Sequence, residues 1–337
     1  MNQRTKQLAW LLISTVILGA LIYVSDPREF VDVLSRSDKR YVVIVILCGV
    51  YTLLMWSVVW HRFFKLLDIP LHFRQSVRLL LAGTFLNAIT PLGRFGGEPF
   101  IATFVASRTD ATTQQALSSV SSSDLSNALP FLTFGAFSIV YVIAFGRARD
   151  VVVDVAIWVG VLILFSVVVV YLLWFGGARS LLEYVGGLVS FRRGFGRWQS
   201  YVESGKRRGR ELLVRMEEVG DNPRSVAVTL AISHLAVLGH IGAVYFALLA
   251  VGVDPVIQTV FVVVTLSAFL TFSPTPGSMG AFEAGFAGLI VVFFPVTTAT
   301  ATSVAILYRI GTFLPGLALG YISLLGLQGA DLDNARS

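Results

Sequence analysis

Long apolar runs, separated by short polar connectors, dominate the chain. Each run has about the 20 residues that a helix needs to cross a bilayer. We therefore predict six full transmembrane helices, at residues 8–24, 41–60, 114–145, 151–175, 224–250 and 297–327. Aromatic residues lie near the ends of the second run, at Tyr41, Trp56 and Trp60. This placement is typical of side chains at a membrane interface.

Two further apolar regions, 76–107 and 258–295, are interrupted in the middle. The first interruption, Asn87–Pro99, reads NAITPLGRFGGEP, and the second, Ser273–Glu283, reads SPTPGSMGAFE. Proline and glycine break helices, and each flanking half is too short to cross alone. We predict two re-entrant hairpins of broken helix, whose irregular backbone is shielded by protein or lines a watery cavity. The residues expected to shape the breaks are Pro91, Gly93, Gly96, Gly97, Pro276, Gly277 and Gly280.

The two breaks share a spacing, since Pro91 precedes Glu98 by the same distance as Pro276 precedes Glu283. We interpret residues 41–145 as a first repeat and residues 224–327 as a second. Counting crossings, the first hairpin enters from the cytoplasm and the second from the exterior, which gives an inverted-topology repeat typical of carriers. A chance similarity stays open, as do hairpins that cross fully, because these would give the same parity.

Basic residues set the orientation. Residues 176–224 contain ten Lys or Arg, so the loop 176–223 is predicted to be cytoplasmic. Arg4 and Lys6 precede the first run and place the N-terminus on the same side. The sequence predicts a multi-pass protein of the cell membrane with both termini in the cytoplasm.

The composition agrees with one integral membrane domain over residues 1–337. Hydrophobic residues make up 55% of the chain and charged residues 14%, against about 25% charged in soluble domains. Cys48 is the one cysteine, and the four histidines lack metal-ligand spacing, so we expect neither a metal nor another cofactor. The net charge of +6 reflects orientation, and nucleic acid is not expected as a partner.

Ionisable residues at the two breaks are the candidates for chemistry, because charges inside a membrane are costly. Glu98 and Glu283 could bind a proton or a cationic group, or could cap the half-helices that begin beside them. Arg94 and Arg309 could bind phosphate oxygens through their planar guanidinium groups. The alternative for Arg309 is an internal salt bridge with Glu283 or Glu98.

Two polar residues complete the set of candidate ligands. Asn87 opens the first break. Asp124 follows a run of serines in the region 114–145, where Asn127 also lies. These side chains could line a polar path, but small hydroxyl residues are also common where membrane helices pack together.

The two breaks resemble signatures of the lysylphosphatidylglycerol synthase transmembrane-region family, a flippase-like membrane domain. The first signature corresponds to Asn87, Pro91, Arg94, Gly97 and Glu98, with one extra residue before the arginine and one doubled glycine. The second corresponds to Pro276, Gly277, Gly280 and Glu283, with Ser278 in place of a glycine. A Leu-x-Arg segment resembles Leu307–Arg309. The early part of 114–145 departs from the family, because Ser123, Asp124 and Asn127 stand where a Glu-Arg pair and an Asp are common.

The resemblance implies that this chain corresponds to the translocating membrane part of such proteins, without the soluble synthase domain. We expect a flippase-like translocase of a lipid or of a lipid-linked anionic headgroup, with membrane lipid as its substrate. An ion-coupled carrier of a small solute and a membrane-embedded enzyme of lipid or glycan assembly are the alternatives. No catalytic motif is recognised, so catalysis is not expected. A homo-oligomer and a separate lipid- or glycan-modifying enzyme are compatible partners.

Overall fold

The computed structural model describes residues 15–90, 97–145, 218–273 and 275–334, together with residues 164, 168 and 214. Within these residues the secondary structure is helical. Residues 91–96, most of the predicted run 151–175 and most of the basic loop lie outside the described residues. Arg94, Pro91, Gly93 and Gly96 are therefore not placed.

The helices follow the predicted apolar runs closely. After a helix at Thr15–Val24, they are α2 (Pro27–Arg36), α3 (Lys39–Leu66), α4 (Phe73–Ile89), α5 (Glu98–Ala106), α6 (Thr113–Phe145), α10 (Pro223–Ala250), α11 (Ile257–Leu270), the short 3₁₀ helix η2 (Pro276–Ser278), α12 (Ala281–Phe293), α13 (Thr298–Thr312) and α14 (Leu314–Asn334).

Four segments within the described residues are long and apolar enough to cross a membrane. They are Lys39–Leu66, Pro223–Ala250, Pro276–Phe293 and Thr298–Leu327. This establishes an all-α membrane protein. The third segment is not one regular helix, because Gly277, Ser278 and Gly280 have positive φ angles that interrupt it.

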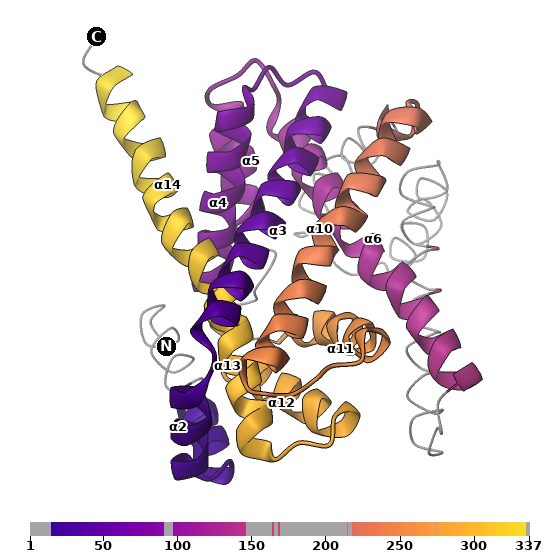
Figure 1. The fold of residues 1–337 in the computed structure, drawn as a ribbon. Coiled ribbons are helices and arrows are strands. Elements are labelled where there is room, and N and C mark those ends of the chain that lie inside the picture. The colour runs from indigo at the N-terminus through magenta and orange to yellow at the C-terminus, as the bar shows by residue number, and fades with distance from the viewer. Residues whose placement is uncertain are drawn as a thin grey trace, which may run out of the picture.

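The centre of the fold is an antiparallel pair of long helices, α3 and α10 (Figure 1). The start of α3 contacts the end of α10, and the end of α3 contacts the start of α10. The backbone N–H of Asp38 donates to the Ala250 carbonyl at 2.8 Å. At the opposite end, Arg62 Nε donates to Thr229 Oγ1 at 2.8 Å. This pair forms the frame on which the broken helices pack.

Glycine allows α13 to pack closely against α3. A Cβ built on Gly49 would overlap the Gly311 carbonyl oxygen, and one built on Gly311 would overlap Val45. Small residues let membrane helices approach to backbone contact. The same device joins α3 to α10, where a Cβ on Gly239 would overlap the Thr52 hydroxyl.

The two pairs of short helices lie at opposite ends of the molecule (Figure 1). The pair α4 and α5 lies at the upper end in this view, beside the end of α3, and the pair α11 and α12 lies at the lower end, beside the end of α10. Each pair belongs to its own hydrophobic core. One core joins α10 to α13 around the second break, and the other joins α3 to α6 around the first.

Three details differ from the sequence prediction. Helix α3 continues to Leu66, because Phe63 and Phe64 are fully buried in the core beyond Trp60. The connector 25–40 contains the amphipathic helix α2, which Asp26 caps by accepting from the Arg28 N–H. The last predicted run divides at Phe313 into α13 and α14.

Candidate functional site

The second break has a backbone that only a glycine-rich sequence adopts easily. Gly277 and Gly280 have φ angles of 57° and 79°, in the left-handed region that glycine enters without strain. Ser278 also has a positive φ, of 56°. Its hydroxyl donates to the Thr271 carbonyl at 2.8 Å, which fixes the turn against the end of α11.

Glu283 closes this break from inside α12. Its Oε2 accepts the backbone N–H of Gly280 at 2.6 Å, so the carboxylate caps the start of the helix. The residue is 5% exposed. A buried carboxylate is costly unless it is paired and hydrogen-bonded, and the second oxygen meets that requirement through Arg309.

Arg309 extends from α13 to the second break. Its Nε donates to Glu283 Oε1 at 2.7 Å, and its Nη2 donates to the Gly277 carbonyl at 2.7 Å. The guanidinium also lies over the rings of Phe313 and Phe282, at 3.9 Å and 5.0 Å from their centroids. The arginine thus holds the turn, the glutamate and two aromatic rings together, and its position is fixed.

The first break is closed in a parallel way by Asn87 at the end of α4. Its Oδ1 accepts the backbone N–H of Gly97 at 2.7 Å, next to the start of α5. A Cβ on Gly97 would lie 2.7 Å from that oxygen and 2.9 Å from the Gly83 carbonyl oxygen, so the approach requires glycine. Glu98 begins α5 and accepts from Ser121 Oγ on α6 at 3.2 Å.

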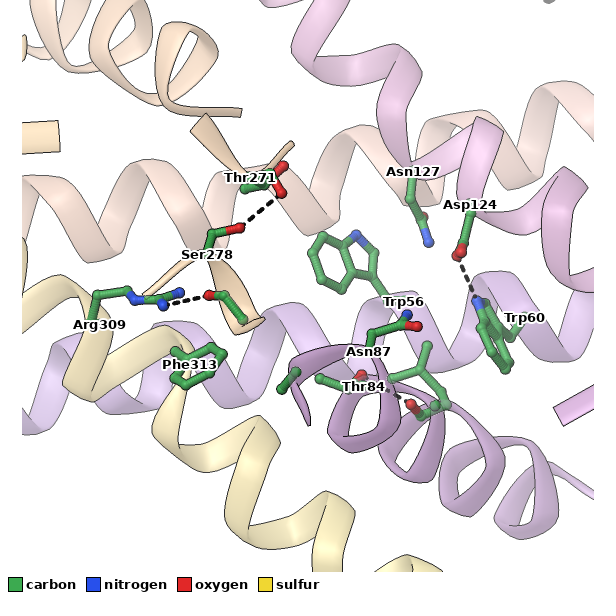
Figure 2. A pocket seen from close by; sticks show the side chains of 14 residues that line it. Trp56, Trp60, Thr84, Asn87, Asp124, Asn127, Thr271, Ser278, Arg309 and Phe313 are labelled. Atoms are coloured by element: carbon green, nitrogen blue, oxygen red, sulfur yellow. Dashed lines mark hydrogen bonds between the residues drawn. The ribbon is translucent and has the colours of Figure 1, made fainter. Parts of the chain in front are cut away.

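The second break packs against the end of α4. A Cβ built on Gly277 would lie 3.2 Å from the Ala88 carbonyl oxygen and 2.9 Å from Phe313 Cζ. A cavity of about 200 Å³ lies where the two halves of the chain meet. Its described lining comes from α3, α4, α6, the second break, α13 and Phe313, and comprises Trp56, Trp60, Leu80, Gly83, Thr84, Asn87, Ala88, Asp124, Asn127, Thr271, Gly277, Ser278, Arg309 and Phe313 (Figure 2).

The cavity has two polar ends. Figure 2 shows Arg309 and Ser278 at one end and Asp124 with Asn127 at the other, with the Trp56 indole between them. Asp124 Oδ1 accepts from Trp60 Nε1 at 3.2 Å. Asn127 is held by Ser233 of α10, whose Oγ lies 3.1 Å from Asn127 Oδ1.

The serines of α6 do not line the cavity; they lie where α6 packs against neighbouring helices. Ser119, Ser122, Ser123 and Ser126 are fully buried. Ser126 contributes its backbone carbonyl, which accepts from Ser233 Oγ at 2.8 Å. These contacts agree with the packing alternative for the serines, while Asp124 faces the cavity.

The structure brings together only part of the predicted set. Asn87, Asp124, Gly277 and Arg309 line one cavity, and Glu283 lies behind Arg309 as its ion-pair partner. Glu98 is at the start of α5 and is not among the described lining residues.

Sequence reasoning missed the two tryptophans of this cavity. Trp60 is 5% exposed and therefore does not face lipid at an interface as expected. Trp56 and Trp60 are four residues apart in α3 and so share one face of the helix. That spacing puts the two rings together but does not say which neighbours this face of α3 contacts.

Together, the apolar helices, the broken pairs and the buried ion pair define a polytopic α-helical membrane protein with a cavity whose mostly apolar lining includes Arg309 and Asp124. The sequence profile of the lysylphosphatidylglycerol synthase TM region matches residues 8–320, and the chain belongs to this family.

Curated relatives align with the chain over nearly its whole length. A UPF0104 membrane protein of Methanothermobacter thermautotrophicus is 23% identical, over 93% of this chain and 93% of the relative. One from Pyrococcus horikoshii is 23% identical, over 95% and 97%. One from Methanocaldococcus jannaschii is 24% identical, over 95% of each chain. Their names describe membrane proteins and give no substrate.

Proposed function

We propose that this protein is a flippase-like translocase that moves a lipid, or a lipid-linked anionic headgroup, across the cell membrane. The observation that carries the proposal is the cavity between the two breaks. Its lining includes a guanidinium, a carboxylate and two indoles, in a helical protein in which 55% of the residues are hydrophobic. Ionisable residues at such a place mark substrate paths in membrane proteins.

The proposed architecture has six spans and two opposed re-entrant hairpins, with both termini in the cytoplasm. The helix lengths support re-entrance. With a rise of 1.5 Å per residue, α4 with 17 residues extends about 26 Å. On the same basis, α5, α11 and α12 extend about 14, 21 and 20 Å. All four are shorter than the hydrocarbon core of about 30 Å, and α12 reaches spanning length only when it is counted together with the interrupted turn at 276–280.

The helix contacts support an inverted repeat. If α3, α4, α5 and α6 correspond to α10, α11, α12 and the last crossing, each contact in one half should have a counterpart in the other. Three such pairs of contacts are present: α5 packs on α6 as α12 packs on α13, α4 packs on α14 as α11 packs on α6, and α3 packs on α4 as α10 packs on α11. Sites of repeat-built transporters lie at the interface between the repeats.

The size of the cavity supports a headgroup as its occupant. Pockets for drug-sized ligands are about 300–1,000 Å³, so a cavity of about 200 Å³ is closer in size to a headgroup than to a whole lipid. In the proposed mechanism the headgroup enters the cavity while the tails stay in lipid. Arg309 and the backbone of the breaks attract the anionic group, and Arg94 is expected to join them. Opening toward one side and then the other would complete the transfer.

The same volume also fits a small solute, so an ion-coupled carrier remains the second candidate. The two functions predict different effects on the lipid composition of the two leaflets. We would compare the lipid composition of each leaflet in cells with and without the protein. A headgroup translocase predicts that one lipid class changes its distribution between leaflets, whereas a solute carrier predicts unchanged leaflets.

A further inference from the structure

Helix α6 contains a proline in its middle, Pro130. Proline has no backbone N–H, so the carbonyl four residues earlier, that of Ser126, loses its partner within the helix. Membrane helices tolerate proline because neighbouring groups satisfy the freed carbonyl. Here the neighbour is Ser233 of α10, whose Oγ donates to the Ser126 carbonyl at 2.8 Å. Ser233 is fully buried, so the contact is shielded from water.

A second contact joins α6 to α10 just beyond the proline. His234 Nδ1 lies 2.8 Å from the Leu230 carbonyl oxygen, which can only accept, so this nitrogen carries the hydrogen of the neutral ring. Nε2 is then an acceptor, and the Thr133 hydroxyl lies 2.9 Å from it. Thr133 Oγ1 also lies 3.1 Å from the Pro130 carbonyl oxygen. Side-chain contacts from α10 therefore support α6 on both sides of the proline.

Pro130 also marks a change of neighbours along α6. Leu125 and Leu129, before the proline, pack against the hydrophobic core around the first break. Phe131 and Phe134, after it, pack against the core around the second break. The two halves of α6 therefore belong to different packing units, which meet at the proline.

The second half of α6 is connected to the cavity through α11. The rings of Phe134 and Phe261 meet edge to face, with their centroids 5.3 Å apart. Helix α11 leads to Thr271, which lines the cavity and whose carbonyl accepts from Ser278 Oγ at 2.8 Å. A movement of Phe134 would therefore displace the second break and change the shape of the cavity.

We propose that α6 bends at Pro130, so that its second half moves with α11 against the frame of α3 and α10, and that the Ser233 hydroxyl holds this hinge in the position described here. Proline weakens a helix locally because it removes a hydrogen bond, and a hinge is a short stretch that absorbs a change in backbone angles. The inference goes beyond the proposed function, because it concerns the moving part and applies equally to a lipid headgroup and to a small solute.

A double-mutant cycle tests the link between Ser233 and the proline. Ser233→Ala leaves the Ser126 carbonyl unpaired, so it should lower the unfolding temperature in detergent by about 2–4 °C. Pro130→Ala returns an N–H to position 130, so Ser233→Ala should lower the unfolding temperature much less in that background. Equal losses in the two backgrounds would show that the Ser233 hydroxyl does not compensate for the proline, and would overturn the inference.

Ser303→Ala is the matched control for this cycle. Ser303 is also fully buried, and its hydroxyl donates at 2.9 Å to the Ala299 carbonyl within its own helix, α13. That carbonyl keeps its backbone partner when the hydroxyl is removed. The loss from Ser303→Ala should therefore be the same with and without Pro130→Ala.

The movement itself is measured by double electron–electron resonance between two spin labels on the full chain in nanodiscs, without substrate. In a background with Cys48→Ala, one label replaces Val43 on α3 and the other replaces Phe137, on α6 beyond the proline. These two side chains are 55% and 64% exposed. In the control pair, the second label replaces Thr113, at the start of α6.

Ser233→Ala should broaden or displace the distribution of distances between positions 43 and 137, and should leave the distribution between 43 and 113 unchanged. Adding Pro130→Ala should narrow the first distribution again, because the Ser126 carbonyl regains a partner within the helix. A 43–137 distribution that Ser233→Ala leaves unchanged, or an equal change in the control pair, would overturn the hinge. Circular dichroism shows whether each variant is folded. Neither measurement uses a substrate, so a failure to translocate lipid would count against the proposed function and leave the hinge standing.

Discussion

Arg309 and Glu283 form a buried ion pair, with Nε and Oε1 2.7 Å apart and side chains that are 14% and 6% exposed. The pair joins α13 to the second break across 26 positions of sequence. The carboxylate also caps α12, and the guanidinium also binds the Gly277 carbonyl. The ion pair therefore holds the start of α12 and the turn at Gly277 in place. The stability of the break and the shape of the cavity therefore depend on the same contact.

Removing one partner of this pair should destabilise the protein more than removing both. Arg309→Met leaves a buried unpaired carboxylate, at a cost of about 3–5 kcal/mol. The double variant Arg309→Met with Glu283→Gln removes both charges and should recover part of that loss. Thermal unfolding in detergent measures the three variants. If the double variant were as unstable as the sum of the two single ones, the pair would not be coupled in the folded protein.

The double variant also separates two roles of Arg309. If the arginine only neutralises Glu283, the double variant should fold and should still translocate lipid. If it also contacts the phosphate, as proposed here, the double variant should fold and lose translocation. Arg94→Lys gives an independent comparison for the first break, because lysine keeps the charge and loses the planar fork.

Gly277→Ala should destabilise the protein more than Gly252→Ala. Both glycines have positive φ, 57° and 79°, so an alanine at either position costs about 1–2 kcal/mol in backbone strain. A Cβ at position 252 meets no atom within 4 Å, whereas one at 277 lies 2.9 Å from Phe313 and 3.2 Å from the Ala88 carbonyl. The difference in unfolding temperature therefore reports the contact between the second break and α4. Equal losses in the two variants would mean that this contact is absent.

Gly49→Ala should force α3 and α13 apart, because the added methyl group would overlap the Gly311 backbone. We expect a loss of about 1–3 kcal/mol or more, as for overpacking of a rigid core. Gly288→Ala is the control, since no atom lies within 4 Å of its Cβ and glycine is the poorer helix former. It should be neutral or stabilising by up to about 1 kcal/mol. Equal stability of Gly49→Ala and the wild type, measured by thermal unfolding, would contradict the close packing.

The helices could be predicted from hydrophobicity because lipid imposes long apolar runs. The start of α10 coincides with its signals, an Asn222 cap followed by Pro223. The extent of α3 could not be predicted, since the segment after Trp60 alternates charged residues with Phe63 and Phe64. Only tertiary packing buries those two rings completely. Helix α2 was missed for a similar reason, because its charged sequence resembles a loop.

The sequence identified the charged residues of the candidate site, but it did not identify the residues that they contact. Arg309 stood out as an arginine in apolar sequence, but the sequence left its carboxylate open between Glu283 and Glu98. The structure pairs it with Glu283, while Glu98 binds Ser121. Trp56 could not be assigned to the cavity without knowing which face of α3 meets α4 and the second break. Partner choice depends on the packing of distant segments, which local patterns do not encode.

The proposed topology predicts that two connecting segments lie on opposite sides of the membrane. In a background with Cys48→Ala, a cysteine in place of Arg28 should be labelled from outside intact cells by a membrane-impermeant maleimide. A cysteine in place of Lys206, in the basic loop, should be labelled only after the membrane is opened. Labelling of both from the same side would break the crossing count and with it the inverted repeat.

The central claim is that the cavity between the two breaks carries a lipid headgroup across the membrane. The most direct measurement uses proteoliposomes with acyl-labelled fluorescent phosphatidylglycerol and an external quencher that cannot cross the bilayer. We predict that wild-type protein makes inner-leaflet lipid accessible to the quencher, and that Arg94→Ala and Glu283→Gln, recovered as folded protein, lose most of this activity. Full activity in both variants, or equal quenching with and without the protein, would contradict the account.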